Sequence, residues 1–139
     1  MRKRLIGALA GLVALVLPTV NAAAATAKTI VTTKRVTGPQ AVADRWGYVE
    51  VILVVKKTTR IVGTHKKVTR KITNVLVPIY PNHTDRSVFI NQQAVPLLTN
   101  EVLTMTQFNP NIEFVGGATA TSGAFAQSLQ AAILQAKKI

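Results

Sequence analysis

The chain has 139 residues, contains no cysteine and carries a net charge of +12. The absence of cysteine excludes disulfides, thiolate metal sites and a cysteine nucleophile, and the length is that of one small domain. The excess of basic residues favours an anionic partner, such as an acidic polymer or an anionic lipid surface.

Residues 1–27 have the order of parts that is typical of a secretory signal peptide. Basic residues at positions 2–4 precede an uncharged apolar run from Leu5 to Leu17, and small residues follow Pro18. Two small-x-small triplets, at 22–24 and 25–27, fit a cleavage site. An uncleaved N-terminal anchor is the alternative, although the apolar run is shorter than the ~20 residues of a spanning helix. We therefore expect an exported protein, in the cell envelope or secreted, with one domain at 28–139 and no nucleic acid partner.

Three segments are rich in strand-forming residues. Lys28 to Val36 is rich in Thr, Val and Ile and predicts a strand. Tyr48 to Val55 is the strongest strand, and its apolar residues on both sides indicate that both of its faces are largely covered. Ile72 to Tyr80 is its expected partner, with Pro78 placing it at an edge or a strand end.

The segment from Lys56 to Lys71 joins the second and third of these strands. Its Thr, Val and Ile residues favour an extension of both strands into a long hairpin, with a tip near Gly63 to Lys66. Its seven basic residues are interrupted by no acid and are Lys56, Lys57, Arg60, Lys66, Lys67, Arg70 and Lys71. They indicate either a solvated hairpin or a contact surface for an anionic membrane or cell-wall polymer.

Two helical segments follow the strands. Asp85 or Ser87 is a candidate cap for a short helical piece over 88–93, and Pro96 suits the first turn of a second piece that reaches about Thr104. The final helix is expected at Gly123 to Lys138, with Thr121 or Ser122 as its N-cap. The expected inward faces consist of Val88, Val95, Leu98, Val102 and Met105 in the first segment and Phe125, Leu129, Ala132, Ile133 and Ala136 in the second. Strands followed by helices predict an α+β fold: a small antiparallel sheet with a long hairpin, packed by two helical segments.

The stretch Val115 to Ser122, VGGATATS, leads directly into the final helix. Its glycines permit close approach of another group to the backbone. A helix N-terminus offers unpaired N–H groups and partial positive charge, which suit a phosphate. The same residues also suit an ordinary turn and cap, so this pattern alone leaves both interpretations open.

The sequence gives little support for hydrolytic catalysis or for a metal site. The two histidines, His65 and His83, lie in the basic tip and in a turn, and no serine has the surroundings of a nucleophile elbow. Five acidic residues provide no catalytic pair, and no cluster has the spacing of metal ligands. We therefore expect no catalytic residues of the chain's own, no metal site and no enzyme with its own substrate.

From Thr37 to Lys138 the chain resembles the FMN-binding domain family. This family includes the flavin-carrying domains of the sodium-translocating NADH:quinone reductase and small exported proteins. The segments that carry the resemblance occur along the chain in the family's order. The first is Thr37-Gly38 with the strand Tyr48 to Val55, and the second is Lys71 to Val75, which is similar to the family's GKITDV strand. Next come the helical segment from Arg86 to Leu103 and the stretch from Gln107 to Ile112. Finally, VGGATATS followed by Ala126-Gln127-Ser128-Leu129 is similar to the VSGATxTS signature and the SL after it.

This resemblance implies an exported electron-transfer protein whose FMN cofactor is attached by a phosphoester to Thr119, the threonine of the Gly-Ala-Thr triplet. A separate flavin transferase would deliver the FMN unit from FAD with Mg²⁺. The implied cofactor-binding residues are Gly116, Gly117, Ala118, Thr119, Thr121 and Ser122, with Trp46, Tyr80, Phe114 and Phe125 as candidate walls for the ring system. The electron donor and acceptor are not identified by the resemblance.

The chain departs from the family signature at two positions beside the proposed attachment site. Glu113 stands where the family has Asp, and Gly116 stands where it has Ser or Thr. FMN that is bound without a covalent bond, and a member that has lost its flavin, are therefore alternatives to the linked form. A basic envelope module that contacts anionic polymers or lipid without flavin is the alternative function.

Overall fold

The computed structural model describes residues 26–139, which form an α+β fold. The order is β1 (Lys28–Thr37), β2 (Ala41–Val42), the 3-10 turn η1 (Asp44–Trp46), β3 (Tyr48–Val62), β4 (His65–Ile79), α1 (Asp85–Glu101), the π-helical segment η2 (Val102–Thr106) and α2 (Thr119–Ala136). The predicted leader at 1–27 lies almost wholly outside the described residues. Within the described part, no helix is both long and apolar enough to cross a membrane.

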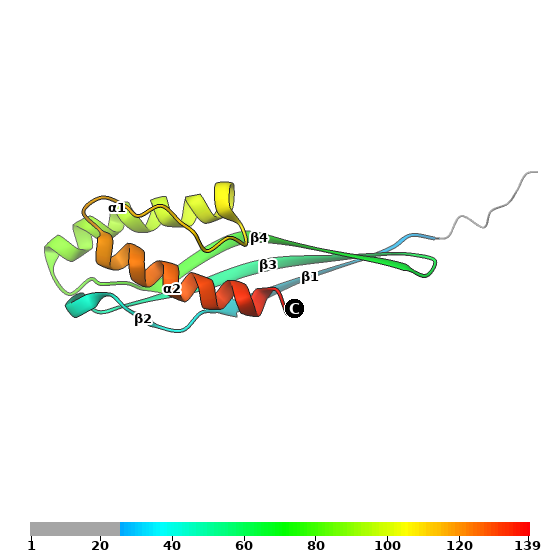
Figure 1. The fold of residues 1–139 in the computed structure, drawn as a ribbon, viewed down its shortest axis with the longest axis horizontal. Coiled ribbons are helices and arrows are strands. Elements are labelled where there is room, and N and C mark those ends of the chain that lie inside the picture. The colour runs from blue at the N-terminus through cyan, green and yellow to red at the C-terminus, as the bar shows by residue number, and fades with distance from the viewer. Residues whose placement is uncertain (1–25) are drawn as a thin grey trace, which may run out of the picture.

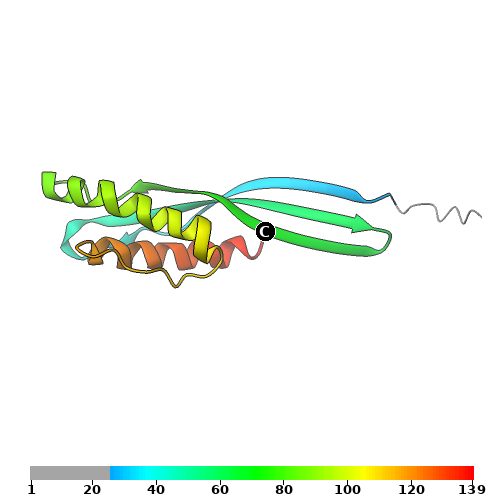
Figure 2. The same cartoon turned by 90° about the horizontal axis from the view of Figure 1, so that it is seen from above.

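The predicted hairpin is confirmed. β3 pairs antiparallel with β1, β2 and β4, and a two-residue turn at Gly63 and Thr64 joins β3 to β4. Gly63 has φ +59°, a conformation that glycine adopts without strain. Figures 1 and 2 show that the distal parts of β1, β3 and β4 extend beyond the helices as a narrow ribbon, with the hairpin turn at its end.

The helices cover one face of the sheet, and the expectation that both faces of β3 are covered is wrong. Val49, Val51, Leu53 and Val55 are at most 1% exposed. The residues that alternate with them, from Tyr48 to Val54, are half-buried or exposed. Because alternate side chains of a strand point to opposite faces, the other face of the sheet points away from the helices, and no element of the described residues 26–139 covers it.

Helix α2 supplies the other side of the core. Its five predicted inward residues are all at most 1% exposed, and α2 makes most of its contacts with β3. Figure 1 shows α2 lying along the sheet, with its C-terminal end near the point where the ribbon leaves the body. The helical spacing of apolar residues therefore predicted this layer correctly.

A close contact between Gly38 and Ser128 joins α2 to the sheet. β1 ends at Thr37 and β2 begins at Ala41, and both strands pair with β3. The chain between them is not part of a strand and passes beside Val51 of β3. The Gly38 N–H donates to the Val51 carbonyl at 2.8 Å, and the Val51 N–H donates to Ser128 Oγ at 2.9 Å. The hydroxyl of α2 thus accepts from a buried sheet amide, which would otherwise be costly to leave unpaired.

Helix α1 is one continuous helix rather than two pieces. Thr84 is its N-cap, in place of the predicted Asp85 or Ser87, and Thr84 Oγ1 accepts from the Ser87 N–H at 3.1 Å. Pro96 lies inside the helix, where it removes the N–H that would bond to the Gln92 carbonyl. Both residues are exposed, so water can satisfy that carbonyl and the helix continues.

The end of this helical segment departs from the predicted apolar stripe. Leu98 and Val102 are fully buried, whereas Met105 is 81% exposed. Met105 lies in η2, where the π-helical turn adds a residue and rotates the following side chains away from the core. The Gln107 side chain then accepts from the Ile72 N–H at 3.0 Å and donates to the Leu103 carbonyl at 2.8 Å, which fastens this end to β4.

The ribbon places like charges directly opposite one another. Lys56 is opposite Lys71, Lys57 is opposite Arg70, and Arg60 is opposite Lys67. The five acidic residues of the chain all lie outside the distal part of the ribbon: Asp44, Glu50, Asp85, Glu101 and Glu113. Like charges that face each other across a sheet destabilise it, so this arrangement lowers the stability of the ribbon.

We expect Lys71→Glu to raise the free energy of unfolding by about 1 kcal/mol at low salt, because an opposite-charge pair replaces the repulsion with Lys56. Urea unfolding at low and high salt measures the change, which should shrink as salt screens the pair. Lys34→Glu is the matched control, since Lys34 is exposed and lies opposite Val55. Equal stabilisation by the two variants would mean that overall charge, and not the cross-strand pair, is responsible.

Candidate functional site

A cavity lies where the N-terminal ends of α1 and α2 meet η1. Its volume is about 340 Å³, and it is open to solvent on one side. None of its lining residues is acidic; they are Trp46, Pro81, Thr84, Arg86, Ser87, Ile90, Asn91, Gly117, Ala118, Thr119, Ala120 and Thr121. Four of the six predicted cofactor-binding residues therefore line it, and Gly116 and Ser122 do not.

The stretch before α2 presents the start of the helix to this cavity. Gly117 has φ +81°, which only glycine adopts readily, and the Ala118 N–H donates to the Val115 carbonyl at 3.0 Å. Helix α2 begins at Thr119, four residues earlier than predicted, and no side chain caps it. The amides of Thr119, Ala120 and Thr121 are thus left without an intrahelical acceptor at the cavity wall.

Thr121 and Ser122 lie inside the first turn of α2, so the prediction that one of them is the N-cap is wrong. Both are buried. Ser122 Oγ accepts from the Val115 N–H at 3.1 Å and fixes the loop against the helix. Thr121 Oγ1 donates to Asn91 Oδ1 at 2.7 Å, so its proton is directed to α1.

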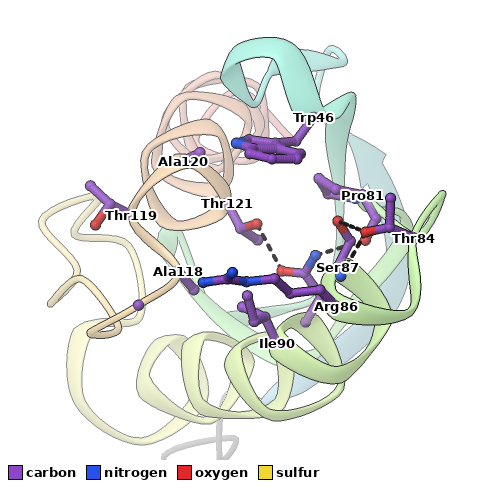
Figure 3. Close-up of a pocket in the computed structure, with 12 residues that line it drawn as sticks. Trp46, Pro81, Thr84, Arg86, Ser87, Ile90, Ala118, Thr119, Ala120 and Thr121 are labelled. Carbon is purple, nitrogen blue, oxygen red and sulfur yellow. Dashed lines mark hydrogen bonds between the residues drawn. The ribbon is translucent and has the colours of Figure 1, made fainter.

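Asn91 connects three parts of the cavity wall. Its Nδ2 donates to the Pro81 carbonyl at 2.7 Å, while its Oδ1 accepts from Thr121. The chain of bonds joins the β4–α1 loop, α1 and α2, and both Asn91 and Thr121 are at most 5% exposed. Figure 3 shows these bonds along the inner side of the cavity, where they hold the two helix ends in a fixed relation.

Thr119 differs from its neighbours because its side chain is exposed. In Figure 3 its hydroxyl lies on the side of the helix turn that faces away from Trp46 and Arg86. Among the hydroxyl groups of residues 115–122, Thr119 alone is accessible to a second protein, since Thr121 and Ser122 are buried. The residue that the resemblance singled out is therefore at the cavity but not directed into its interior.

Arg86 is the cation of the site, and the sequence reasoning did not identify it as a binding residue. It lies in the first turn of α1 and extends along the cavity toward Ala118. Its position contained a signal, because a basic side chain in the first turn opposes the positive end of the helix dipole. The presence of a cation at such a position is easier to explain when it binds an anion outside its own helix.

Trp46 forms the opposite wall, as Figure 3 shows. The guanidinium carbon of Arg45 lies 4.8 Å from its ring centroid, and the His83 ring lies 6.1 Å away at an interplanar angle of 26°. Trp46 is 38% exposed. One ring and one cation thus pack against an indole that is exposed at the cavity and suits contact with a flat ligand.

The other candidate ring walls do not line this cavity. Phe125 is fully buried in the core. Phe114 is 51% exposed and belongs to a separate hollow of about 240 Å³ beside α2. Tyr80 is half-buried and is not among the residues that line the cavity. Of the four proposed aromatic walls, Trp46 alone lines this cavity.

Within residues 26–139, no three His, Asp or Glu side chains are grouped so that they could hold a metal ion. No protein-family model matches the chain, and no curated protein matches it.

Proposed function

We propose that the protein is an exported flavoprotein that binds FMN as its redox group and passes electrons between partners outside the cytoplasmic membrane. One observation carries the proposal: a single cavity combines a free helix N-terminus, an arginine and an exposed tryptophan. These groups match a phosphate at one end of a ligand and a flat ring system at the other. The resemblance to FMN-binding domains supports the same ligand.

The phosphate end is assigned to the start of α2 and to Arg86. The amides of Thr119, Ala120 and Thr121 and the positive end of the helix dipole favour a phosphate. Arg86 adds a charge-assisted hydrogen-bond donor on the other side of the cavity. The absence of acidic residues from the lining means that no fixed negative charge opposes the ligand there.

The ring end is assigned to Trp46. An indole offers a large apolar face to an isoalloxazine ring, and its contacts with Arg45 and His83 limit its motion. The cavity volume of about 340 Å³ lies at the lower end of the roughly 300–1,000 Å³ that ligand pockets occupy. When bound, FMN supplies the one- and two-electron chemistry, and the protein binds, orients and shields it.

Thr119 is the proposed point of covalent attachment, and a phosphate bonded there reaches the helix amides and Arg86 only after the exposed side chain turns toward the cavity. Its oxygen would form a new bond to the FMN phosphorus of FAD as the anhydride bond breaks, with AMP leaving and the hydroxyl proton lost to a base of the flavin transferase. The exposed Thr119 hydroxyl meets the first requirement of this step, which is access by a second protein. The buried hydroxyls of Thr121 and Ser122 do not.

Fluorescence titration of the purified protein with FMN and with riboflavin tests the binding mode. We expect Arg86→Gln to weaken FMN binding by roughly 10- to 100-fold, the effect of a lost charge-assisted hydrogen bond. Riboflavin lacks the phosphate, so its affinity should not change. Trp46→Ala should weaken both ligands by similar factors, because it removes the wall for the ring.

Two outcomes would overturn this assignment. Absence of FMN binding by the wild-type protein, together with an unmodified mass after co-expression with a flavin transferase, would remove the flavin from the proposal. Equal loss of FMN and riboflavin affinity in Arg86→Gln would remove Arg86 from the phosphate site. Arg60→Gln removes the same charge from the ribbon, far from the cavity, and is the control for a general effect of net charge.

A further inference from the structure

The face of the sheet that points away from the helices carries a basic surface that the flavin site does not use. Cross-strand neighbours lie on the same face, and the buried odd-numbered residues of β3 mark the face toward the helices. The register therefore places five cations on the opposite face: Arg35, Lys56, Arg60, Lys67 and Lys71. All five are exposed, and together they are called the outer basic face.

Apolar side chains continue this face toward the body of the protein. Ile52 lies opposite Leu76, and both are half-buried, as is Val54. Val31 lies on the same face opposite Thr58 and is 53% exposed. Cations and aliphatic groups thus share one side of the sheet, opposite the buried residues of β3 on which α2 packs.

The cations of this face repel one another within the folded protein. Lys56 faces Lys71 and Arg60 faces Lys67, so two repulsive pairs are arranged along the ribbon. Arg60 lies four positions after Lys56, which places the two pairs about 13 Å apart along the strand. A feature that lowers stability without an internal compensation indicates a function outside the fold. Here the compensation would be an external array of negative charge.

We propose that the outer basic face docks on an anionic phospholipid bilayer, with its cations among the headgroup phosphates and its aliphatic side chains at the headgroup level. The open sheet face suits a flat charged surface, and its mixture of long basic and aliphatic side chains suits the boundary between headgroups and acyl chains. A soluble linear polyanion would use the charge but would gain nothing from Ile52, Leu76 and Val31.

This orientation turns α1 and α2 away from the lipid, because they cover the other face of the sheet. The helix ends that form the cavity would then be presented to partners beyond the bilayer surface. The docking itself depends on the outer basic face and the aliphatic residues beside it and does not rest on the flavin assignment, so either proposal can fail without the other.

Vesicle sedimentation tests the docking. The full chain is mixed at about 0.1 M salt, where the screening length is about 10 Å, with phosphatidylcholine vesicles and with vesicles that also contain phosphatidylglycerol. The measured quantity is the excess of binding to the anionic vesicles. Binding through the N-terminal segment, with its basic residues at positions 2–4 and its apolar run, is the same in every variant, so the comparison between variants removes it.

Two variants of equal charge separate this face from general electrostatics. The outer-face variant is Lys56→Gln/Arg60→Gln/Lys67→Gln/Lys71→Gln. The control variant is Lys28→Gln/Lys34→Gln/Lys66→Gln/Lys138→Gln, in which the first three residues lie on the helix side of the ribbon by register and all four are exposed. Each basic residue near an anionic surface is worth about a factor of five in binding, so the loss of four should cost the outer-face variant roughly 600-fold. The control variant, whose cations do not face the lipid, should lose less than tenfold.

The outer-face variant should fold, since it removes two repulsive pairs, and urea unfolding checks this. Equal losses in the two variants would overturn the proposal, as would wild-type protein that shows no preference for the anionic vesicles. Soluble polyglutamate is the remaining arm of the test. Binding to polyglutamate without binding to the anionic vesicles would assign the surface to an acidic polymer and would also overturn the proposal.

Discussion

Replacing Thr119 with alanine is expected to abolish covalent attachment of flavin completely. In cells that co-express a flavin transferase, the wild-type protein should gain the mass of one esterified FMN and a visible flavin absorbance after denaturation. The Thr119→Ala protein should keep its unmodified mass, because the one exposed hydroxyl of the VGGATATS stretch is then gone. Intact-mass spectrometry of the denatured proteins is the measurement.

Two further variants make this result specific. Thr119→Ser retains a hydroxyl at the start of α2 and should remain modified. Thr121→Ala removes the bond to Asn91 and should lower stability by about 1–3 kcal/mol, the effect of leaving a buried polar group unpaired. It should nevertheless remain modified, because its own hydroxyl is buried and is not the acceptor. Modification that persists in Thr119→Ala would place the bond on another residue.

Unmodified wild-type protein that still binds FMN would have a different meaning. Gly116 and Glu113 replace the residues that the family signature has beside the threonine. The cavity is built from the main chain of α2, Arg86 and Trp46, so it does not require a covalent bond to hold FMN. Such a result would retain the binding proposal and reject the phosphoester.

The strands and the last helix could be predicted because their signals are local. Alternation along β3 and helical spacing in α2 are properties of short windows, and the hairpin turn at Gly63 and Thr64 lies within the predicted tip. Whether a strand is covered on one face or two depends on which elements pack against it. The apolar residues Ile52 and Val54 suggested two layers, but the helices among residues 26–139 cover one face of the sheet.

Element boundaries were harder to predict because long-range contacts decide them. Thr121 and Ser122 resemble caps in sequence, yet Asn91 and the Val115 amide hold their hydroxyls inside the first turn of α2. Pro96 resembles a helix start, yet its exposed position allows the helix to pass through it. In both cases the three-dimensional surroundings of the residue, which the sequence pattern does not contain, overrode a local preference.

The same distinction between local sequence signals and long-range contacts applies to the candidate site. The Gly-Ala-Thr loop could be located from the sequence because its residues are adjacent. Arg86 and Trp46 come from other parts of the chain, and only the fold brings them to the same cavity. The basic residues of the ribbon are an intermediate case. The sequence shows that they are present, but only the strand register shows which of them lie on each face of the sheet.

Gly38→Ala is expected to lower the free energy of unfolding by about 2–3 kcal/mol, toward the upper end of the effect of overpacking a closely packed site. A Cβ at this position would meet the Ser128 main-chain carbonyl and would lie 2.6 Å from Ser128 Oγ. Neither group can move freely. The carbonyl belongs to α2, and the hydroxyl accepts from the buried Val51 N–H.

Urea unfolding followed by Trp46 fluorescence measures this effect as a lower midpoint at unchanged slope. Gly116→Ala is the matched control, because a Cβ there would have no neighbour within 4 Å. Its effect should be near zero or stabilising by up to about 1 kcal/mol through the lower entropy of the unfolded chain. Equal stability of Gly38→Ala and the wild type would mean that α2 can shift away from the sheet. That result would contradict the fixed contact between Ser128 and Val51 on which the position of α2, and so of the cavity wall, depends.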